Sequence, residues 1–282
     1  GPDEANRAFG LALIRLMNGE TVCRDRFGGD ADLFAFALGN VVQELGAGKI
    51  NCFGFRSPKT EREFLVVFMG DADAGERMDR YAVSCMRRVA EQLHALFGLV
   101  TVSAVGESDG SAEGLSEAYR TARQFIGNVD LLALDGLPVL VPGKASSPVF
   151  PKGGGDVGSA GAAARNGPEP SITARMGMIR HALEEGNLNY ACGILKDFLG
   201  VVRQSGRFSL GSADRMLQEF ILLLHEMALD LGVPNEELVR GCEASLRDKG
   251  IPFDYVHFAS YGRLLEQVLL DFGEKIQSFL RR

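Results

Sequence analysis

One stretch in the middle of the chain, residues 143–170, constrains the fold most. It reads GKASSPVFPKGGGDVGSAGAAARNGPEP and consists almost entirely of small, polar and proline residues. Such a segment buries too little apolar surface to offset the entropy lost on ordering, which is typical of a flexible linker. We therefore predict two domains, residues 3–142 and 171–282, as the length of 282 residues also suggests.

Charge and hydropathy exclude several classes of protein. The net charge is −7, whereas a domain that binds the nucleic-acid backbone carries an excess of lysine and arginine. No apolar run is long enough to cross a bilayer, and no secretory signal opens the chain. The five cysteines are dispersed and include no CxxC pair, so we predict buried thiols in a reducing cytoplasm.

The N-terminal domain contains both apolar residues at helical spacing and apolar runs typical of strands. Apolar residues at helical spacing predict helices, and β-branched or alternating runs predict strands, two of which form a hairpin around the polar turn at 56–62. The predicted helices are 8–17, ending near Gly19; 32–46, capped by Asp32 or the residues just before it; 73–97; and 115–127. The predicted strands are 50–55, 64–69, 99–106 and 131–134, with a further candidate at 139–141.

The C-terminal domain contains no convincing strand. Glycine and proline punctuation predicts helices at about 172–185, 187–204, 211–231, 234–247 and 253–281. The fold class is therefore a mixed domain, α+β or α/β, followed by an all-helical domain. The Gly1-Pro2 start resembles a protease scar, and the last helix has no stop signal, so we expect a fragment of a longer protein.

Each apparent catalytic motif lacks residues that its chemistry requires. Gly143-Lys144 lacks the earlier glycine and the following hydroxyl of a phosphate-binding loop. His225-Glu226 lacks the second histidine of a zinc-protease helix and is interpreted as part of an ordinary helix. Asp71 and Asp73 are better explained by a solvated turn and a helix cap than by a cation site. The sequence predicts no catalytic residue, no metal ligand and no cofactor.

The order of residues 30–135 resembles a known family. Phe34–Leu45 (FAFALGNVVQEL) is similar to the helix that precedes the hairpin in the degenerate GGDEF-like domains of AraC-type regulators. Val100–Gly106 (VTVSAVG) is similar to a strand of those domains, and Leu115–Phe125 (LSEAYRTARQF) to the helix that follows it. The helical half resembles, more loosely, the segment that joins such a domain to an AraC-type helix-turn-helix pair.

The resemblance also implies where activity would be lost. An active diguanylate cyclase carries GG[DE]EF at the hairpin turn, where glycines admit GTP phosphates and an acid binds metal. Here the turn is Arg56–Arg62, and only Glu63-Phe64 remains. The family's first strand, with its metal-binding aspartate, has no clear match, since residues 19–31 are short and polar, and Gly28-Gly29-Asp30 precedes a helix. Without metal carboxylates, phosphoryl transfer loses its main electrostatic support, so we predict no enzymatic activity.

The resemblance implies a signal-transmitting, dimerising region of an AraC-type response regulator. Such a region would act in the cytoplasm as a homodimer, reach DNA only through a domain outside this fragment, and make no membrane contact. One alternative is a sensor for a sugar or nucleotide effector, for which Tyr190, Tyr255, His257 and Tyr261 could line a pocket unless they are core residues. The other alternative is a PucR/CdaR-type regulator.

Overall fold

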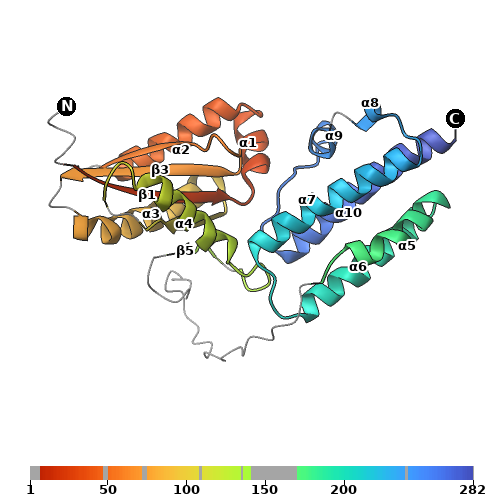
Figure 1. Ribbon diagram of the computed structural model, residues 1–282. Helices are drawn as coiled ribbons and strands as arrows, with labels where there is room; N and C mark the ends of the chain where they lie inside the picture. The colour runs from red at the N-terminus through yellow and green to blue at the C-terminus, as the bar shows by residue number, and fades with distance from the viewer. Residues whose placement is uncertain are drawn as a thin grey trace. The chain divides into compact units, whose positions relative to one another are not determined.

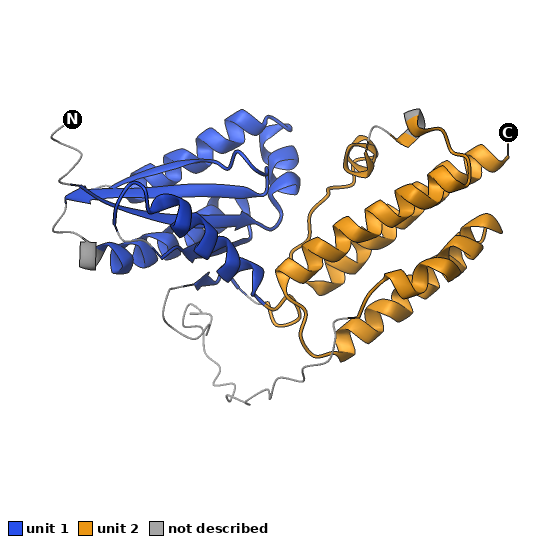
Figure 2. Cartoon of the chain, viewed as in Figure 1, with its two compact units in different colours: residues 1–129, 135–153 blue, residues 130–134, 154–282 orange. Residues whose placement is uncertain are grey.

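The computed structural model describes residues 7–46, 50–71, 75–107, 110–134, 136–140, 170–238 and 241–281 (Figure 1). The chain divides into two compact units (Figure 2). We call residues 1–129 with 135–153 the α/β unit, and residues 130–134 with 154–282 the helical unit. The predicted linker at 143–170 lies outside the described residues, apart from Pro170.

The α/β unit is built on one mixed sheet. Within the described ranges its strands are β1 (Arg7–Leu16), β2 (Asn51–Arg56), β3 (Glu63–Asp71), β4 (Thr101–Val105) and β5 (Val139–Leu140). The order across the sheet is β2-β3-β1-β4-β5; β4 and β5 are parallel and the other pairs antiparallel. The predicted hairpin is confirmed as β2 and β3, with Phe55 opposite Leu65. The strand order places β1 at the centre.

The predicted helix at 8–17 is wrong, because these residues form β1. This strand pairs with β3 on one side and β4 on the other, so that Leu13 is opposite both Leu65 and Ala104. A central strand buried on both faces has a nearly continuous apolar sequence, which periodicity alone does not distinguish from a buried helix. The long-range pairing therefore decides the conformation of this segment.

The polar stretch after β1 is also more ordered than we predicted. It contains helix α1 (Gly19–Phe27), which ends at Gly28 with a left-handed φ of 62°. Helix α2 (Ala31–Leu45) follows, and its N-cap is Asp30, whose carboxylate accepts hydrogen bonds from the backbone N–H groups of Asp32 and Leu33. The prediction of a cap at Asp32 or just before it is confirmed.

Helices cover both faces of the sheet. Alternate β1 side chains, including Ala12, Ile14 and Leu16, share one core with α2 and with α3 (Gly75–Phe97). Helix α4 (Leu115–Gly127) packs against β1 and β4 and crosses in front of the strands in Figure 1. The predicted helices around α3 and α4 are thus confirmed, although residues 72–74 lie outside the described ranges.

The predicted strand at 131–134 is wrong. These residues belong to the helical unit, where the Leu131 N–H donates to the Phe208 carbonyl at 2.7 Å. The Asp130 carboxylate accepts from the N–H groups of Leu132 and Phe208, at 3.1 and 3.0 Å. The short strand β5 corresponds to the second candidate at 139–141, of which Val141 is not described.

The helical unit confirms most of the predicted helices: α5 (Thr173–Glu184), α6 (Leu188–Gln204), α7 (Leu210–Asp230) and α10 (Phe258–Leu280). The predicted helix at 234–247 is instead two helices, α8 (Asn235–Leu238) and α9 (Cys242–Asp248), with Gly241 between them at a φ of 68°. Helix α10 begins later than predicted, because His257 caps it by exchanging hydrogen bonds with Ser260.

A buried carboxylate ties α9 to α10. Asp271 Oδ1 accepts hydrogen bonds from Ser245 Oγ at 2.7 Å and from Lys249 Nζ at 2.8 Å, and Oδ2 lies 2.8 Å from Lys275 Nζ. Burial alone would raise the pKa of Asp271, but the hydrogen bonds from Lys249, Lys275 and Ser245 outweigh it and lower the pKa. The charged form therefore stabilises the helical unit.

We expect Asp271→Asn to destabilise the helical unit by about 1.5 to 3 kcal/mol at pH 7, the worth of hydrogen bonds to a charged group. Because the folded-state pKa is depressed, this stability is present above the unfolded pKa of about 3.9 and is lost as the pH falls through the folded value. Urea unfolding of both proteins from pH 7 to pH 3 measures it. The difference between the two free energies of unfolding should begin to shrink below about pH 4 and keep shrinking toward pH 3, and a constant difference would contradict the assignment.

Candidate functional site

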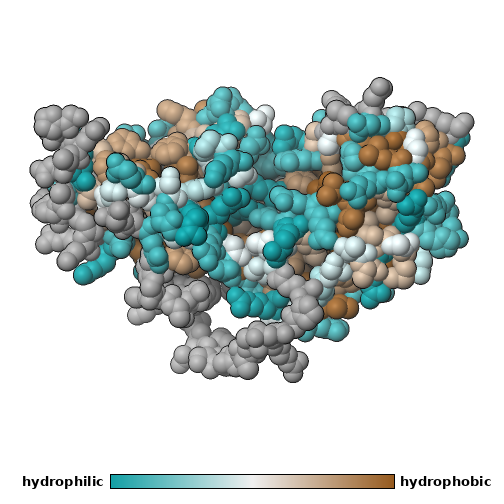
Figure 3. All heavy atoms as spheres, viewed as in Figure 1, coloured by the Kyte–Doolittle hydropathy of each residue, from teal (hydrophilic) through white to brown (hydrophobic). Residues whose placement is uncertain are grey.

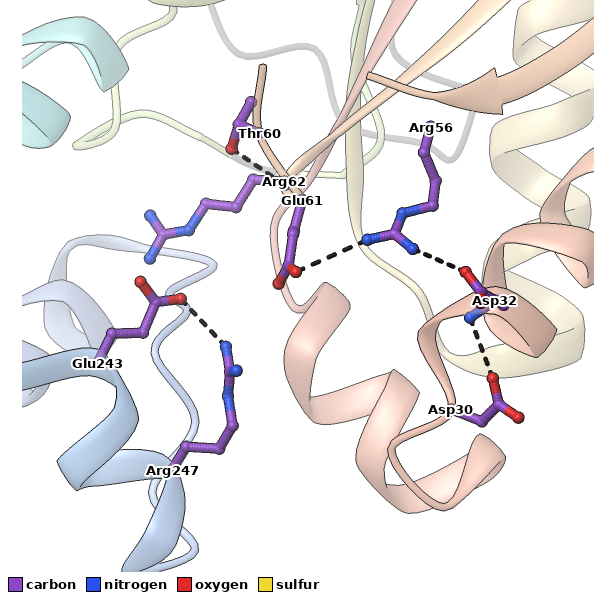
Figure 4. Close-up of polar contacts among 8 residues, drawn as sticks. All are labelled: Asp30, Asp32, Arg56, Thr60, Glu61, Arg62, Glu243 and Arg247. Carbon is purple, nitrogen blue, oxygen red and sulfur yellow. Dashed lines mark hydrogen bonds and ion pairs between the residues drawn. The ribbon is translucent and has the colours of Figure 1, made fainter. Parts of the chain in front are cut away.

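The candidate site is the β2–β3 turn, where the family resemblance places the catalytic motif. Side-chain hydroxyls rather than glycines stabilise this turn. Ser57 donates its N–H to the Glu63 carbonyl at 3.0 Å, and Ser57 Oγ accepts from the Lys59 N–H at 3.2 Å. Thr60 Oγ1 accepts from the Arg62 N–H at 3.2 Å (Figure 4). The backbone N–H groups of Lys59 and Arg62 are therefore engaged within the turn.

Glu63, the acid at the position that the resemblance assigns to the motif, is buried, with 4% of its surface exposed. Its Oε2 accepts a hydrogen bond from the Tyr119 hydroxyl at 2.7 Å and lies 3.4 Å from Ser57 Oγ, which donates to it. Its Oε1 lies 3.2 Å from Arg123 Nε. Tyr119 and Arg123 are one turn apart on α4, so both carboxylate oxygens are occupied by side chains that join the hairpin to that helix.

Tyr119 lies at the centre of this polar cluster. Burial raises the pKa of its hydroxyl, and the hydrogen bond to Glu63 raises it further. Lys59 Nζ lies 4.9 Å from the centre of the Tyr119 ring, at cation–π distance. The ring thus contacts the turn through Lys59 while its hydroxyl holds Glu63.

We expect Tyr119→Phe to destabilise the α/β unit by about 1.5 to 3 kcal/mol, because it removes a hydrogen bond to a buried charge while keeping the ring beneath Lys59. The check is urea unfolding of the single variants Tyr119→Phe and Glu63→Gln and of the double variant. The double variant should cost clearly less than the sum of the two single costs. Strict additivity would show that the two groups are not coupled.

Exposed ion pairs surround the turn. Arg56 NH1 lies 3.1 Å from Asp32 Oδ1, and Arg56 NH2 lies 3.6 Å from Glu61 Oε1 (Figure 4). Figure 4 also draws an ion pair within α9 of the helical unit, between Glu243 and Arg247 at 3.2 Å. Pairs this exposed are screened by water and contribute about 0–1 kcal/mol each, so the two pairs of Arg56 add little to the stability of the turn.

The end of β1 differs from what an active cyclase needs. The resemblance expects a metal-binding aspartate on the first strand, yet β1 reads RAFGLALIRL and the next acid along the chain is Glu20, in α1. Within the described ranges, no group of three histidine, cysteine, aspartate or glutamate side chains is placed to hold a metal ion. The turn links β2 and β3 to α4 through Glu63. Both oxygens of this buried carboxylate already have hydrogen-bond or ion-pair partners, so the carboxylate is not free to bind a metal ion.

The residues predicted for a sensor pocket differ in burial and in role. Tyr255 and Tyr261 are core residues, with ring centres 5.0 Å apart. His257 caps α10, and Tyr190 lies on α6 with 54% of its surface exposed.

Of the rejected motifs, His225 is half-buried on α7, as predicted, and Asp71 ends β3. Asp73, Gly143 and Lys144 lie outside the described residues.

Sequence reasoning missed the partners of Glu63. The only signal was the spacing of Tyr119 and Arg123, which places both on one face of a helix. Nothing in the sequence indicated that this face meets the hairpin. The cysteine prediction is confirmed for four thiols, which are free and buried, whereas Cys23 is only half-buried.

Large apolar side chains remain exposed on both units, and Figure 3 shows hydrophobic residues on the visible surface of each. In the α/β unit they lie on α2 and the edge strand β2: Phe36 is 66% exposed, and Phe53 and Phe55 are 45% exposed each. Exposed aromatic side chains at a sheet edge favour contact with another chain.

Comparison with known proteins supplies no relative. No protein-family model matches the chain, and neither a curated protein nor a solved structure shows significant similarity to it. The described helices include none long and apolar enough to cross a membrane.

Proposed function

We propose that this chain is the signal-transmitting region of an AraC-type bacterial transcription regulator, with a catalytically inactive GGDEF-like domain and a helical connector. In this role the α/β unit is a scaffold that receives and passes on an input. DNA is contacted through a helix-turn-helix domain outside the chain, and the active form is a homodimer in the cytoplasm.

The order of elements supports the proposal. The resemblance requires a first strand ahead of the helix that precedes the hairpin, and β1 supplies a strand there. After it come α1, α2, the β2–β3 hairpin, α3, β4 and α4, in the order of the resembling segments. One departure from the family pattern, the apparent lack of a first strand, is thereby removed, while the absence of an acid on that strand remains.

The observation that carries the proposal is the state of Glu63. In an active cyclase the hairpin acid must be free to bind a metal ion, and phosphoryl transfer depends on that charge. Here Tyr119, Arg123 and Ser57 occupy both oxygens, and the turn lacks the glycines that would admit phosphates. Through Glu63 the turn instead links the hairpin to α4, as expected of a domain that transmits a conformational change.

The exposed aromatic residues on α2 and β2 support the dimeric part of the proposal. Light scattering on the chain should give twice its mass of 30.4 kDa. A monomer at micromolar concentration would place dimerisation outside this region.

We expect no thermal stabilisation by GTP or cyclic di-GMP in the presence of Mg²⁺, and no cyclic di-GMP formed from GTP. A ligand at 100 times its dissociation constant stabilises a protein by about 2.7 kcal/mol. For a protein of this size each kcal/mol shifts the melting temperature by roughly 2–4 °C, so binding is readily detected. A shift with a nucleotide or with any member of a sugar panel would identify a sensor instead, and product formation would identify an enzyme.

The AraC-type assignment itself is tested by reading the natural gene beyond the codon for Arg282. We expect two helix-turn-helix units in the encoded protein. Any other domain there would refute the assignment while leaving the inactivity of the α/β unit as a separate question.

A further inference from the structure

Helix α7 of the helical unit carries large apolar side chains on its outward face. The helix packs along α10 (Figure 1), where the Ala213 carbonyl accepts a hydrogen bond from the Tyr261 hydroxyl at 2.8 Å. Leu222 is nine residues from Ala213, or two and a half helical turns, so it lies on the opposite face of α7. Leu222 is 57% exposed, and Leu229, two turns later on the same face, is 41% exposed.

The spacing of residues on this face indicates what kind of element it fits. Five side chains follow one another at intervals of three, four, three and four residues, and we call them the α7 stripe: Arg215, Gln218, Leu222, His225 and Leu229. Four of them are exposed and His225 is half-buried. This alternation is the pattern by which one helix packs against another, and polar members of such a pattern set register and orientation.

The order of charges along α7 indicates which helix fits. Arg215 lies near its start and the exposed Glu226 near its end. They are eleven residues apart, close to three full turns, so both lie on the same side of the helix. If a second α7 lies antiparallel with the two Leu222 side chains opposite each other, Arg215 of one copy and Glu226 of the other are about 4.5 Å apart along the axis. A parallel pair would instead bring like charges together.

We propose that the α7 stripe binds a second copy of this chain, with the two α7 helices antiparallel about a two-fold axis at Leu222. Each contact then occurs twice, as in any isologous interface, and two Arg215–Glu226 ion pairs flank the central leucines. This inference rests on the dimeric part of the proposed function and not on the AraC-type assignment. It concerns the helical unit and is separate from the exposed aromatic residues on α2 and β2.

The first test is light scattering on the intact chain and its variants over a series of concentrations, which gives the dissociation constant of the dimer. Leu222→Glu should give a monomer at micromolar concentration, because two carboxylates would meet at the axis. Val201→Glu is the matched control, since Val201 is 44% exposed on α6, a helix that packs against α5 and α10. This control should dimerise as the wild type does, and circular dichroism checks that both variants are folded.

The second test exchanges the charges. Arg215→Glu and Glu226→Arg should each raise the dissociation constant by about tenfold, because two attractive pairs become two repulsive ones. The double variant, Arg215→Glu with Glu226→Arg, restores both pairs and should dimerise nearly as tightly as the wild type. A double variant that is as weak as the two single effects combined would overturn the antiparallel arrangement.

The outcomes separate this inference from the proposed function. A wild-type dimer that is insensitive to Leu222→Glu and to both charge variants would overturn the α7 contact, while the dimeric part of the proposed function would stand. A wild-type monomer would overturn both.

Discussion

We expect Gly106→Ala to destabilise the α/β unit by about 2 to 3 kcal/mol, the upper range for overpacking. Gly106 follows β4 directly, and a Cβ atom there would overlap the carbonyl oxygen, carbonyl carbon and Cα of Ala118 on α4. These are backbone atoms, so no flexible side chain can move aside. The measurement is the free energy of unfolding of the α/β unit in urea.

The contact that Gly106 permits is reinforced by its neighbours. The Glu107 N–H donates to Thr121 Oγ1 at 2.9 Å, and Thr121 Oγ1 donates in turn to the Ala118 carbonyl at 3.1 Å. The second bond lies within α4, whereas the first joins α4 to the segment after β4, so the helix cannot retreat without breaking the bond from Glu107. Gly200→Ala is the matched control, because an added Cβ on α6 meets nothing within 4 Å. This control should gain stability, by up to about 1 kcal/mol. Equal effects from the two substitutions would contradict the explanation.

The second large effect is expected in the helical unit, where Tyr261→Ala should cost about 3 to 5 kcal/mol. Tyr261 on α10 is fully buried, and its ring centre lies 5.6 Å from that of Phe208 and 5.0 Å from that of Tyr255. Removing the ring leaves a cavity that rigid neighbours cannot fill. Urea unfolding, followed by the loss of helical circular dichroism, measures the cost.

Tyr261→Phe separates the ring from the hydroxyl. The hydroxyl donates to the Ala213 carbonyl on α7 at 2.8 Å, and losing this bond should cost only about 1 kcal/mol. If the phenylalanine variant were as unstable as the alanine variant, the hydrogen bond rather than the packing would hold α7 to α10.

Local patterns were sufficient for much of the fold. The stripe on α3 specifies a helix, the polar turn between the two apolar runs at 50–55 and 64–69 specifies the β2–β3 hairpin, and Asp30 specifies the start of α2 by capping it. The two segments whose conformation was predicted wrongly lack such signals. Residues 8–17 are apolar on both faces, and residues 131–134 are apolar but pair with Phe208, far along the chain.

The position of the candidate site could be predicted from the sequence, but the partners of its residues could not. The position of Glu63 at the hairpin followed from the resemblance, as did the missing glycines. That the carboxylate is satisfied by Tyr119 and Arg123 depends on how α4 crosses the sheet.

The sequence by itself determined which half carries strands and that no familiar catalytic pattern is present, because composition and periodicity act over short distances. Only the tertiary structure decided that residues 7–16 are a central strand and that Glu63 is held by α4. Each depends on contacts between segments that are far apart in the sequence. Such contacts contribute to stability only once folding has brought the segments together.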